Sequence, residues 1–466
     1  MSNADRLALR YCEEGEDNYA VTPDISTNAV TFSMDSTDNS INDSGNGFVT
    51  AGWKAGMKMK VVGFTEAANN ENFIVESVAA GKIIFTPDNL VTTEIAGDSV
   101  TLSAPVLKEL RITGEGLAQE TDIVLSNEMR SDRQKAEVVR TNIRASGDIN
   151  FELSYDDFDV LFAAALQSAG WSDLVTDTQI TFSTDSGDNS VNDSGSGFVA
   201  KGYEADQWIL ISGFTTAANN GLFKIVSVAV GKLVLEGGTV VTEIAGDAVT
   251  IVQGRYIENG TTFRSFTFEK EFSDLAAVFS IFLGMALDGV SLNVKVGEII
   301  TGSLNLVGKS EDSAAATVAV ASEDPGGYEL LNAIDNVTAL LENMTEIEIT
   351  AFAFTLKNNL RARPIVGALG PDSIGSGSIE ISGTLTAYFE SKGLMDKYLD
   401  FDTTQLTLQL QDGDGNRYVI DLPEVRLTAG RQVAGGTNSD IIADMQFAAF
   451  LDATEGVTIR IAKFAA

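Results

Sequence analysis

The stretch MRSDRQKAEVVRTNIRASGDINFELSYDDFDVLFAAALQ, residues 129–167, predicts a polar loop, a long strand and a short helix in succession. Apolar and polar residues alternate from Asp148 to Tyr155, which is the period-two pattern of a half-buried strand. Aspartates at 156, 157 and 159 follow, where the N-terminus of a helix favours negative charge. One face of that helix is apolar, formed by Phe158, Leu161, Phe162 and Leu166.

The composition is that of a folded, β-rich and strongly acidic chain. Its 466 residues are 44% hydrophobic, which allows several domains with real cores. Glycine is frequent (43) and proline rare (7), as expected for many short strands joined by turns. The net charge of −35 gives a surface that repels DNA and anionic membranes.

Histidine is absent and Cys12 is the single cysteine, which removes most hydrolase and zinc mechanisms and any intrachain disulfide. The first residues lack a basic segment followed by an apolar one, so we expect no signal peptide. The longest apolar stretch, residues 276–287, is too short to span a bilayer.

An internal duplication organises the chain. Three segments recur 149–150 residues later with most positions identical: Thr31–Val49 as Thr181–Val199, Gly63–Lys82 as Gly213–Lys232, and Val91–Leu102 as Val240–Ile251. Alternating runs between Gly, Asn and Asp clusters predict that each copy is a small all-β barrel or sandwich. We call residues 28–104 repeat 1 and residues 178–254 repeat 2.

The remaining host chain carries a weaker doubling. The long strand followed by a helix, at 145–166, is echoed at 375–401. We therefore predict two β-rich domains of the sandwich or barrel type in tandem. The first half comprises residues 1–27, 105–177 and 255–312, and the second half residues 313–466. The patterns also predict helices at 273–285 and 328–341.

No stretch of the chain carries a recognised catalytic or nucleotide-binding motif, so we expect neither an enzyme nor a cofactor. The Asp-rich strings 35–45 and 185–195 lack the spacing of a calcium loop, and a polar turn is favoured over a metal site. Residues 412–416, DGDGN, lie between two alternating runs and predict a hairpin turn. We predict no catalytic, cofactor-binding or metal-binding residue.

The polar cluster at residues 129–134 allows two interpretations. The first is a solvated loop beside a long strand. The second is an intersubunit patch in which Arg130, Asp132 and Arg133 form ion pairs with a neighbouring chain.

Several long motifs resemble the major tail tube proteins of bacteriophages with long, non-contractile tails, the siphoviruses. They are LRY at 9–11, LKELRITGEGL at 107–117, EMRSDRQ at 128–134 and SGDINFELSY at 146–155. The third departs by one residue from the EIRSDRQ-like loop of that family. The resemblance extends more loosely over residues 255–466, and the two repeats lie outside its core.

The resemblance implies a structural protein of the virion, assembled in the cytoplasm of the host bacterium. Its subunits would form stacked rings whose joined strands enclose a channel for DNA ejection. Because such rings usually contain six domains, two domains per chain imply three subunits with pseudo-sixfold symmetry, and six subunits is the alternative. Partners would be other copies, neighbouring rings, tail proteins at the tube ends and passing phage DNA, with no membrane anchor.

An acidic channel wall would let DNA slide without binding. We expect Asp148, Glu152, Glu380 and Asp444 to face it, and the two repeats to decorate the outer surface. A repeat-bearing surface adhesin or fibre is the alternative function, and a glycoside-cleaving enzyme ranks below it because no carboxylate pair stands out.

Overall fold

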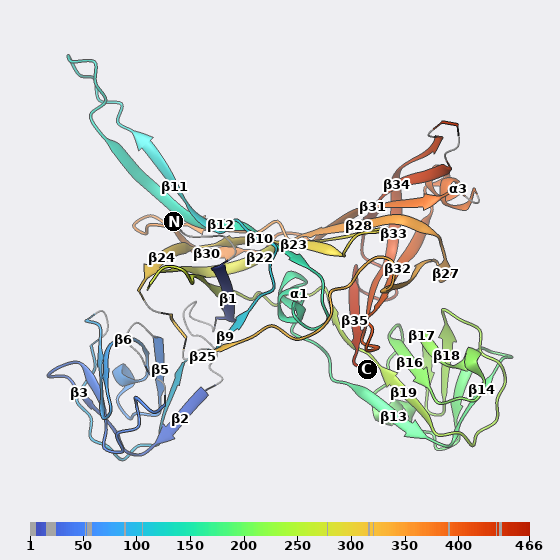
Figure 1. The fold of residues 1–466 in the computed structure, drawn as a ribbon, viewed down its shortest axis with the longest axis horizontal. Helices are drawn as coiled ribbons and strands as arrows, with labels where there is room; N and C mark the ends of the chain where they lie inside the picture. The colour runs from blue at the N-terminus through green and yellow to red at the C-terminus, as the bar shows by residue number, and fades with distance from the viewer. Residues whose placement is uncertain are drawn as a thin grey trace.

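The computed structural model describes residues 6–14, 25–51, 53, 58–87, 90–104, 106–276, 278–315, 317–319, 321–389, 392–434, 436–437 and 440–466. Strands make up 53% of the structure and helices 6%, which confirms the prediction of a mainly β protein (Figure 1).

One large antiparallel sheet, here the central sheet, runs through the whole host chain. Its strands in spatial order are β11 (Ala118–Leu125), β12 (Val138–Glu152), β23 (Thr301–Gly308), β22 (Phe279–Lys295), β28 (Ile349–Lys357), β31 (Glu380–Tyr388), β34 (Ile441–Ala449) and β33 (Arg417–Ala434). The short strand β10 (Gly114–Glu115) also pairs with β12. The first and second halves are therefore joined where β22 pairs with β28.

A second layer of strands packs against each half. In the first half it contains β1 (Leu7–Glu13), β9 (Val106–Glu109), β21 (Phe266–Phe272), β24 (Ser310–Ala314) and β25 (Ala321–Glu323). In the second half it contains β26 (Val337–Glu342), β27 (Thr345–Glu346), β32 (Thr403–Gln411) and β35 (Arg460–Phe464), together with β20 (Arg255–Glu258). A separate hairpin joins β29 (Arg361–Pro364) and β30 (Pro371–Gly375).

The strand pairings of the two halves correspond. The order β1–β21–β22–β24 in the first half is matched by β26–β32–β33–β35 in the second. Likewise β12–β23–β22 is matched by β31–β34–β33. Even a β-bulge coincides, because the register shifts between Leu287 and Gly289 on β22 and between Leu427 and Ala429 on β33.

Glycine occupies matching places in the two halves where neighbouring backbones approach closely. A Cβ on Gly147 of β12 would lie 2.4 Å from the carbonyl oxygen of Gly116, and one on Gly383 of β31 would lie 2.3 Å from that of Ala353. Only glycine fits both positions without a shift of the backbone.

Each repeat forms its own seven-stranded sheet. The first has the order β2 (Ile25–Ala29), β8 (Val100–Ala104), β5 (Lys58–Val62), β6 (Asn72–Ala79), β7 (Lys82–Phe85), β4 (Ser40–Asp43) and β3 (Phe32–Asp35). The second has the same order, with β13 (Val175–Gln179), β19 (Val249–Gln253), β16 (Trp208–Ser212), β17 (Gly221–Ala229), β18 (Lys232–Glu236), β15 (Ser190–Asp193) and β14 (Phe182–Asp185). The 3₁₀ turns η2 (Ala67–Asn69) and η3 (Ala217–Asn219) also match, and repeat 2 adds the short helix α2 (Phe198–Lys201). The first strand of each sheet starts three residues before the predicted boundary of its repeat, at Ile25 and Val175.

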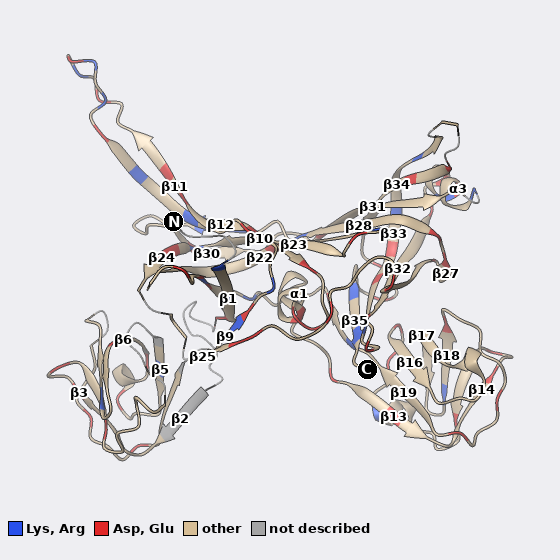
Figure 2. Cartoon of the chain, in the orientation of Figure 1, with Lys and Arg blue, Asp and Glu red and all other residues tan. Residues whose placement is uncertain are grey.

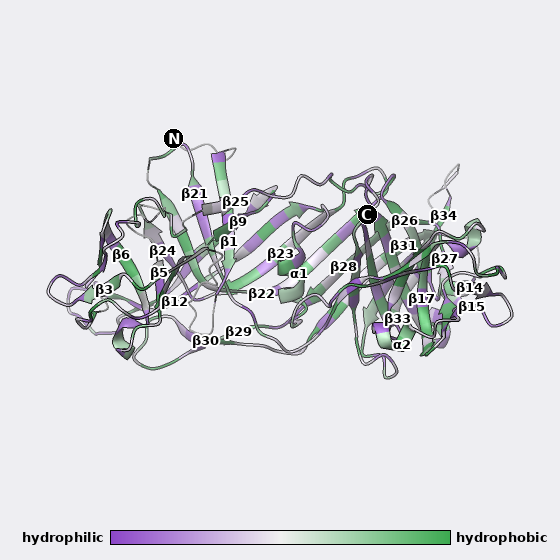
Figure 3. Ribbon diagram, turned by 90° about the horizontal axis from the view of Figure 1, so that it is seen from below, coloured by the Kyte–Doolittle hydropathy of each residue, from purple (hydrophilic) through white to green (hydrophobic). Residues whose placement is uncertain are grey.

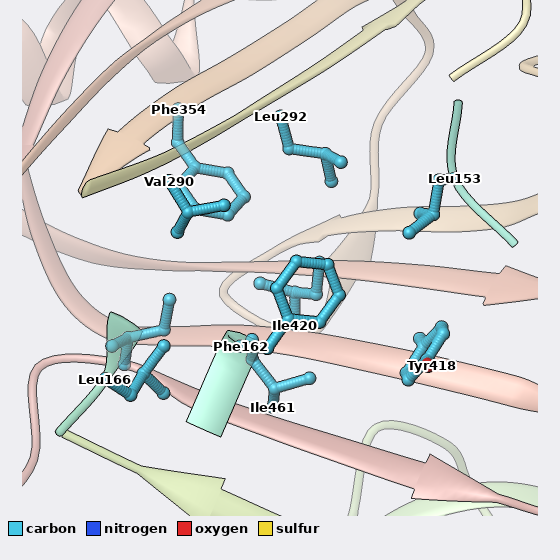
Figure 4. Close-up of a pocket in the computed structure, with 10 residues that line it drawn as sticks. Leu153, Phe162, Leu166, Val290, Leu292, Phe354, Tyr418, Ile420 and Ile461 are labelled. Atoms are coloured by element: carbon cyan, nitrogen blue, oxygen red, sulfur yellow. The ribbon is translucent and has the colours of Figure 1, made fainter. Parts of the chain in front are cut away.

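The helix α1 (Asp159–Ala165) covers one face of the central sheet, in front of β22, β23 and β28 (Figure 3). Its predicted apolar face is buried, and Phe158 stacks on Phe151 of β12 with ring centroids 4.2 Å apart. The hydrophobic core on this side contains residues of both halves. It leaves a wholly apolar cavity of about 20 Å³ between Phe162 and Leu292 of the first half and Phe354 and Ile461 of the second (Figure 4). A cavity without polar partners stays dry.

The predictions of helices at 273–285 and 328–341 are both wrong. Residues 279–285 belong to β22, whose side chains from Ile281 to Leu287 are all buried. A strand buried on both faces has a continuous apolar run, which periodicity cannot separate from a buried helix. Within 328–341 the amide of Asn332 accepts hydrogen bonds from the backbone of Ile334 and Asp335 and turns the chain into β26. The remaining helix, α3 (Gly393–Asp400), follows β31 as α1 follows β12.

The turn predictions are confirmed. Gln411 pairs with Arg417 across the DGDGN hairpin, and Asp412 accepts hydrogen bonds from the backbone and side-chain nitrogens of Asn416. In the Asp-rich strings, Asp43 accepts the backbone N–H groups of Gly45 and Gly47, and Asp193 does the same in repeat 2. Among the described residues, no group of three or more Cys, Asp and Glu could hold a metal ion.

The contact between Phe151 and Phe158 predicts a large effect of truncation. We expect Phe151→Ala to lower the free energy of unfolding of the unassembled subunit by about 3–5 kcal/mol, because it leaves a cavity under α1. Urea denaturation followed by circular dichroism measures this change. The control Asn150→Ala, on the exposed face of the same strand, changes it by less than about 0.5 kcal/mol. Equal effects of the two variants would contradict the packing described.

Candidate assembly surface

The two faces of the central sheet differ in character. On β12, Ile149 and Phe151 point into the core beneath α1, so Asp148, Asn150 and Glu152 lie on the opposite face. The same alternation holds on β31 and β34, where Ile381 and Met445 are buried next to polar neighbours. We call the face away from α1 the polar face.

The polar face holds all four acidic residues singled out from the sequence. Asp148 accepts a hydrogen bond of 2.7 Å from Nδ2 of Asn305 on β23, and Glu152 lies opposite Thr301. Glu380 on β31 lies opposite Lys357 on β28. Asp444 on β34 accepts hydrogen bonds of 2.9 Å and 2.7 Å from Nε and Nη2 of Arg431 on β33.

The sequence reasoning missed the basic residues of this face. Lys295, Lys357 and Arg431 occupy the same side of their strands as the four acids. Alternation along 349–357 places Lys357 on the face opposite the buried Phe352, Phe354 and Leu356. This pattern could have predicted Lys357 on the polar face from the sequence. Arg431 follows a β-bulge that inverts the alternation, and local periodicity gives no sign of it.

The central sheet ends in two open edges. At one end β11 pairs with β12 alone, and at the other the segment 427–434 of β33 pairs only with β34, among the strands that the structure describes. Both edges present backbone N–H and C=O groups that a further strand can pair with. Within the chain, the corresponding edge of β22 is covered by β28, residue by residue from Gly289–Lys357 to Lys295–Ala351.

The strands β11 and β12 extend beyond the sheet as a long hairpin, here called the arm (residues 118–144; Figure 1). Its outer part has many exposed apolar side chains, namely Ile123, Val124, Leu125, Met129, Val138 and Val139. Exposed apolar side chains concentrated on one projecting segment are typical of a contact surface.

The arm also carries basic residues (Figure 2). At its tip, Arg130 forms an ion pair of 2.9 Å with Asp132 of the same loop, and the hydrogen bond from Arg130 lowers the pKa of Asp132. Arg133 is exposed and adopts a left-handed backbone conformation with φ 61°. The predicted patch thus lies at the tip of the arm.

The second half places a shorter hairpin over the first half. Between β29 and β30, Gly370 lies against the side chain of Ile143 on β12. Nearby, Asn358 donates a hydrogen bond of 2.8 Å to the carbonyl oxygen of Ala165, and Gln167 donates one of 3.0 Å to Ser376. The hairpin of the second half therefore packs on the long strand β12 of the first half.

A buried polar cluster ties α1 to the last strand of the chain. Lys463 of β35 forms ion pairs with Asp156, at 2.7 Å, and with Asp159, and Tyr418 donates its hydroxyl hydrogen to Asp159. Burial raises the pKa of Asp159 to about 6, more than the attraction of Lys463 lowers it. Although burial raises the pKa of Asp156, its hydrogen bonds with Asp159 and Lys463 lower it overall.

The comparisons with known proteins identify the class. The family described as phage tail tube protein matches residues 68–449, so the chain belongs to this family. No curated protein matches it. It is therefore a structural tail tube protein of a bacteriophage, a class that implies self-assembly into a tube, a place in the virion tail and a non-enzymatic role.

Among the residues that the structure describes, no helix has the length and apolar character needed to cross a bilayer. Cys12 is buried on β1, and its Sγ lies 3.9 Å from the carbonyl oxygen of Thr267 on β21.

The buried cluster predicts a pH dependence of stability. Because the folded chain raises the pKa of Asp159 from 3.8 to about 6, its stabilising contribution is complete below about pH 4 and is lost as the pH rises through 6. We expect the free energy of unfolding of the wild type, relative to Asp159→Asn, to fall by up to about 3 kcal/mol between pH 4 and 7. Denaturation curves across this range measure it.

The variant Asp156→Asn is the matched control for Asp159→Asn. Because the pKa of Asp156 is lowered, its contribution is present above about pH 4 and is lost as the pH falls further. The wild type should therefore gain stability relative to this variant as the pH rises at the acid end. A constant difference from Asp159→Asn across pH 4–7 would rule out the raised pKa.

Proposed function

We propose that three copies of this chain form one ring of the tail tube, and that each ring contains six similar domains. The observation that carries this is the pairing of β22 with β28, which joins the two halves of one chain edge to edge. The corresponding strands at the open edges are β33 and β11. Pairing β33 of one chain with β11 of the next repeats the same junction and closes the ring.

The shape of the central sheet supports this arrangement. Both of its ends bend away from the side that carries α1 and the two repeats (Figure 1). Three copies joined at their open edges would enclose a channel on the polar face. The helix and both repeats would then lie outside, and the repeats would decorate the tube surface.

The wall of this channel would be polar and only weakly acidic. Asp148, Glu152, Glu380 and Asp444 face it, and Lys295, Lys357 and Arg431 partly balance their charge. Serine, threonine and asparagine occupy many of the remaining positions, for example Ser303, Thr355 and Ser382. Phage DNA would meet no basic surface to bind and would slide through during ejection.

The arm would connect neighbouring subunits and successive rings. The hairpin β29–β30 packs on β12 within one chain, and the arm holds the corresponding place in the first half. Its exposed apolar residues, Arg130 and Arg133 would contact the next chain, whose surface is acidic overall. The tube would grow in the cytoplasm of the infected bacterium and meet other tail proteins at its two ends.

Electron cryomicroscopy of assembled tubes tests the ring. We expect three chains per ring, a continuous inner wall built from six similar domains and the four named acids on the channel surface. The expectation follows from the doubled strand order and the two open edges. Rings of six chains would reject the proposed symmetry. A channel lined by α1 and the repeats, or by a basic surface, would reject the proposed wall.

Assembly kinetics test the role of the arm. We expect Arg130→Ala combined with Arg133→Ala to raise the subunit concentration needed for polymerisation by about tenfold, because interfacial charged contacts are lost. Light scattering of purified subunits measures this concentration. Gln134→Ala is the control in the same loop, and it leaves polymerisation unchanged. If the double variant assembles like the control, the basic residues of the arm have no part in assembly.

A further inference from the structure

The two repeats have the same strand order, each in its own sheet, but differ in how they attach to the host chain. Repeat 2 packs on the second half through Trp208, which shares a hydrophobic cluster with Leu341, Val419, Ala462 and Phe464. Among the residues that the structure describes, the core of repeat 1 is formed by its own side chains. Between described residues, no hydrogen bond or ion pair joins 25–104 to the rest of the chain.

Charged groups reinforce the attachment of repeat 2. Lys224 is 1% exposed and forms ion pairs of 3.1 Å with Asp421 of β33 and 2.5 Å with Glu455. Trp208 lies directly opposite Lys224 in the sheet and donates a hydrogen bond of 3.4 Å to the same Asp421. A lysine buried to this degree is tolerated only where carboxylates surround it.

A second basic residue extends the contact from the host side. Arg460 of β35 bonds to Glu258 and Glu455, at 2.7 Å each, and to the carbonyl oxygen of Asp206 in repeat 2, at 2.7 Å. Asp421 is itself held by Thr407 and Gln405 of β32. The acceptor surface is therefore built into the second half.

Repeat 1 has different residues at the positions that form this contact face. The positions of Trp208 and Lys224 are held in repeat 1 by Lys58 and Ile74, which lie directly opposite each other on β5 and β6. Ile74 is 37% exposed where Lys224 is buried. The matching surface of the first half is also different, because Ile281 and Leu283 of β22 are covered there by Leu107, Val318 and Ala319.

The chain enters repeat 2 from the first half, after α1, and repeat 2 docks on the second half. It is therefore tied to the first half by the chain and to the second half by its docking face. We propose that repeat 2 is an internal brace, with Trp208 and Lys224 as positioning residues, that sets the angle between the halves, and that repeat 1 is an independent appendage with no part in it. The inference that this angle sets the curvature of the ring rests on the proposed function.

An exchange of residues between the repeats tests the brace. The variant Trp208→Lys with Lys224→Ile gives repeat 2 the residues of repeat 1, and Lys58→Trp with Ile74→Lys is the reciprocal control. Hydrogen exchange is measured on unassembled subunits of both and of the wild type. We expect amides of β35 and β16 to exchange at least about tenfold faster in the first variant and unchanged in the control.

Amides of β15 and β18 report whether repeat 2 itself stays folded, because its core is separate from the docking face. If they lose protection too, Glu455→Gln is used instead, since it weakens the contact from the host side. It should also speed exchange of β35 at least about tenfold while β15 and β18 stay protected. Unchanged exchange in either folded variant would overturn the brace.

Electron microscopy of polymerised material then tests the link to ring geometry. We expect the first variant to give tubes of irregular diameter or open arcs, and the control to give regular tubes. Regular tubes from the first variant, despite fast exchange of β35, would show that the docking exists but does not set the curvature. If the wild type forms no rings, the proposed function fails, while the exchange result still decides whether repeat 2 is docked on the second half.

Discussion

The pairing of β22 with β28 is the interaction on which the rest of the molecule depends. It merges the strands of both halves into one central sheet, whose open edges, among the strands that the structure describes, are β11 and the end of β33. Unpaired strand edges are costly when buried and adhesive when exposed. The chain covers one such edge internally and presents the corresponding edges at its two ends, which is the physical basis of the proposed ring closure.

Several contacts on the side of the sheet that carries α1 stabilise that junction. The core beneath α1 draws side chains from both halves, and the cluster of Asp156, Asp159, Tyr418 and Lys463 links α1 to the last strand. Repeat 2 adds a second link through Lys224 and Asp421. These contacts lie on the side of the sheet opposite the polar face, which is the face proposed to line the channel.

Local patterns were sufficient for the elements whose signals are local. The alternation in 148–155, the apolar face of α1, the duplication of the repeats and the DGDGN turn are all present as predicted. The helices predicted at 273–285 and 328–341 failed because a doubly buried strand and a side-chain-bonded turn both resemble a buried helix in sequence. Domain boundaries and the channel-facing role of the four acids stay predictions.

By itself the sequence determined the mainly β class, the internal repeats and the family resemblance, because these follow from periodicity and from contiguous motifs. Only the tertiary structure decided that β22 pairs with β28, that Lys357 and Arg431 share a face with Glu380 and Asp444, and that Trp208 and Lys224 dock one repeat while the other stands apart. The reason is that strand partners, register shifts and docking faces join residues far apart in the chain. Two repeats with the same strand order can then differ in role through two side chains whose partners lie some two hundred residues away.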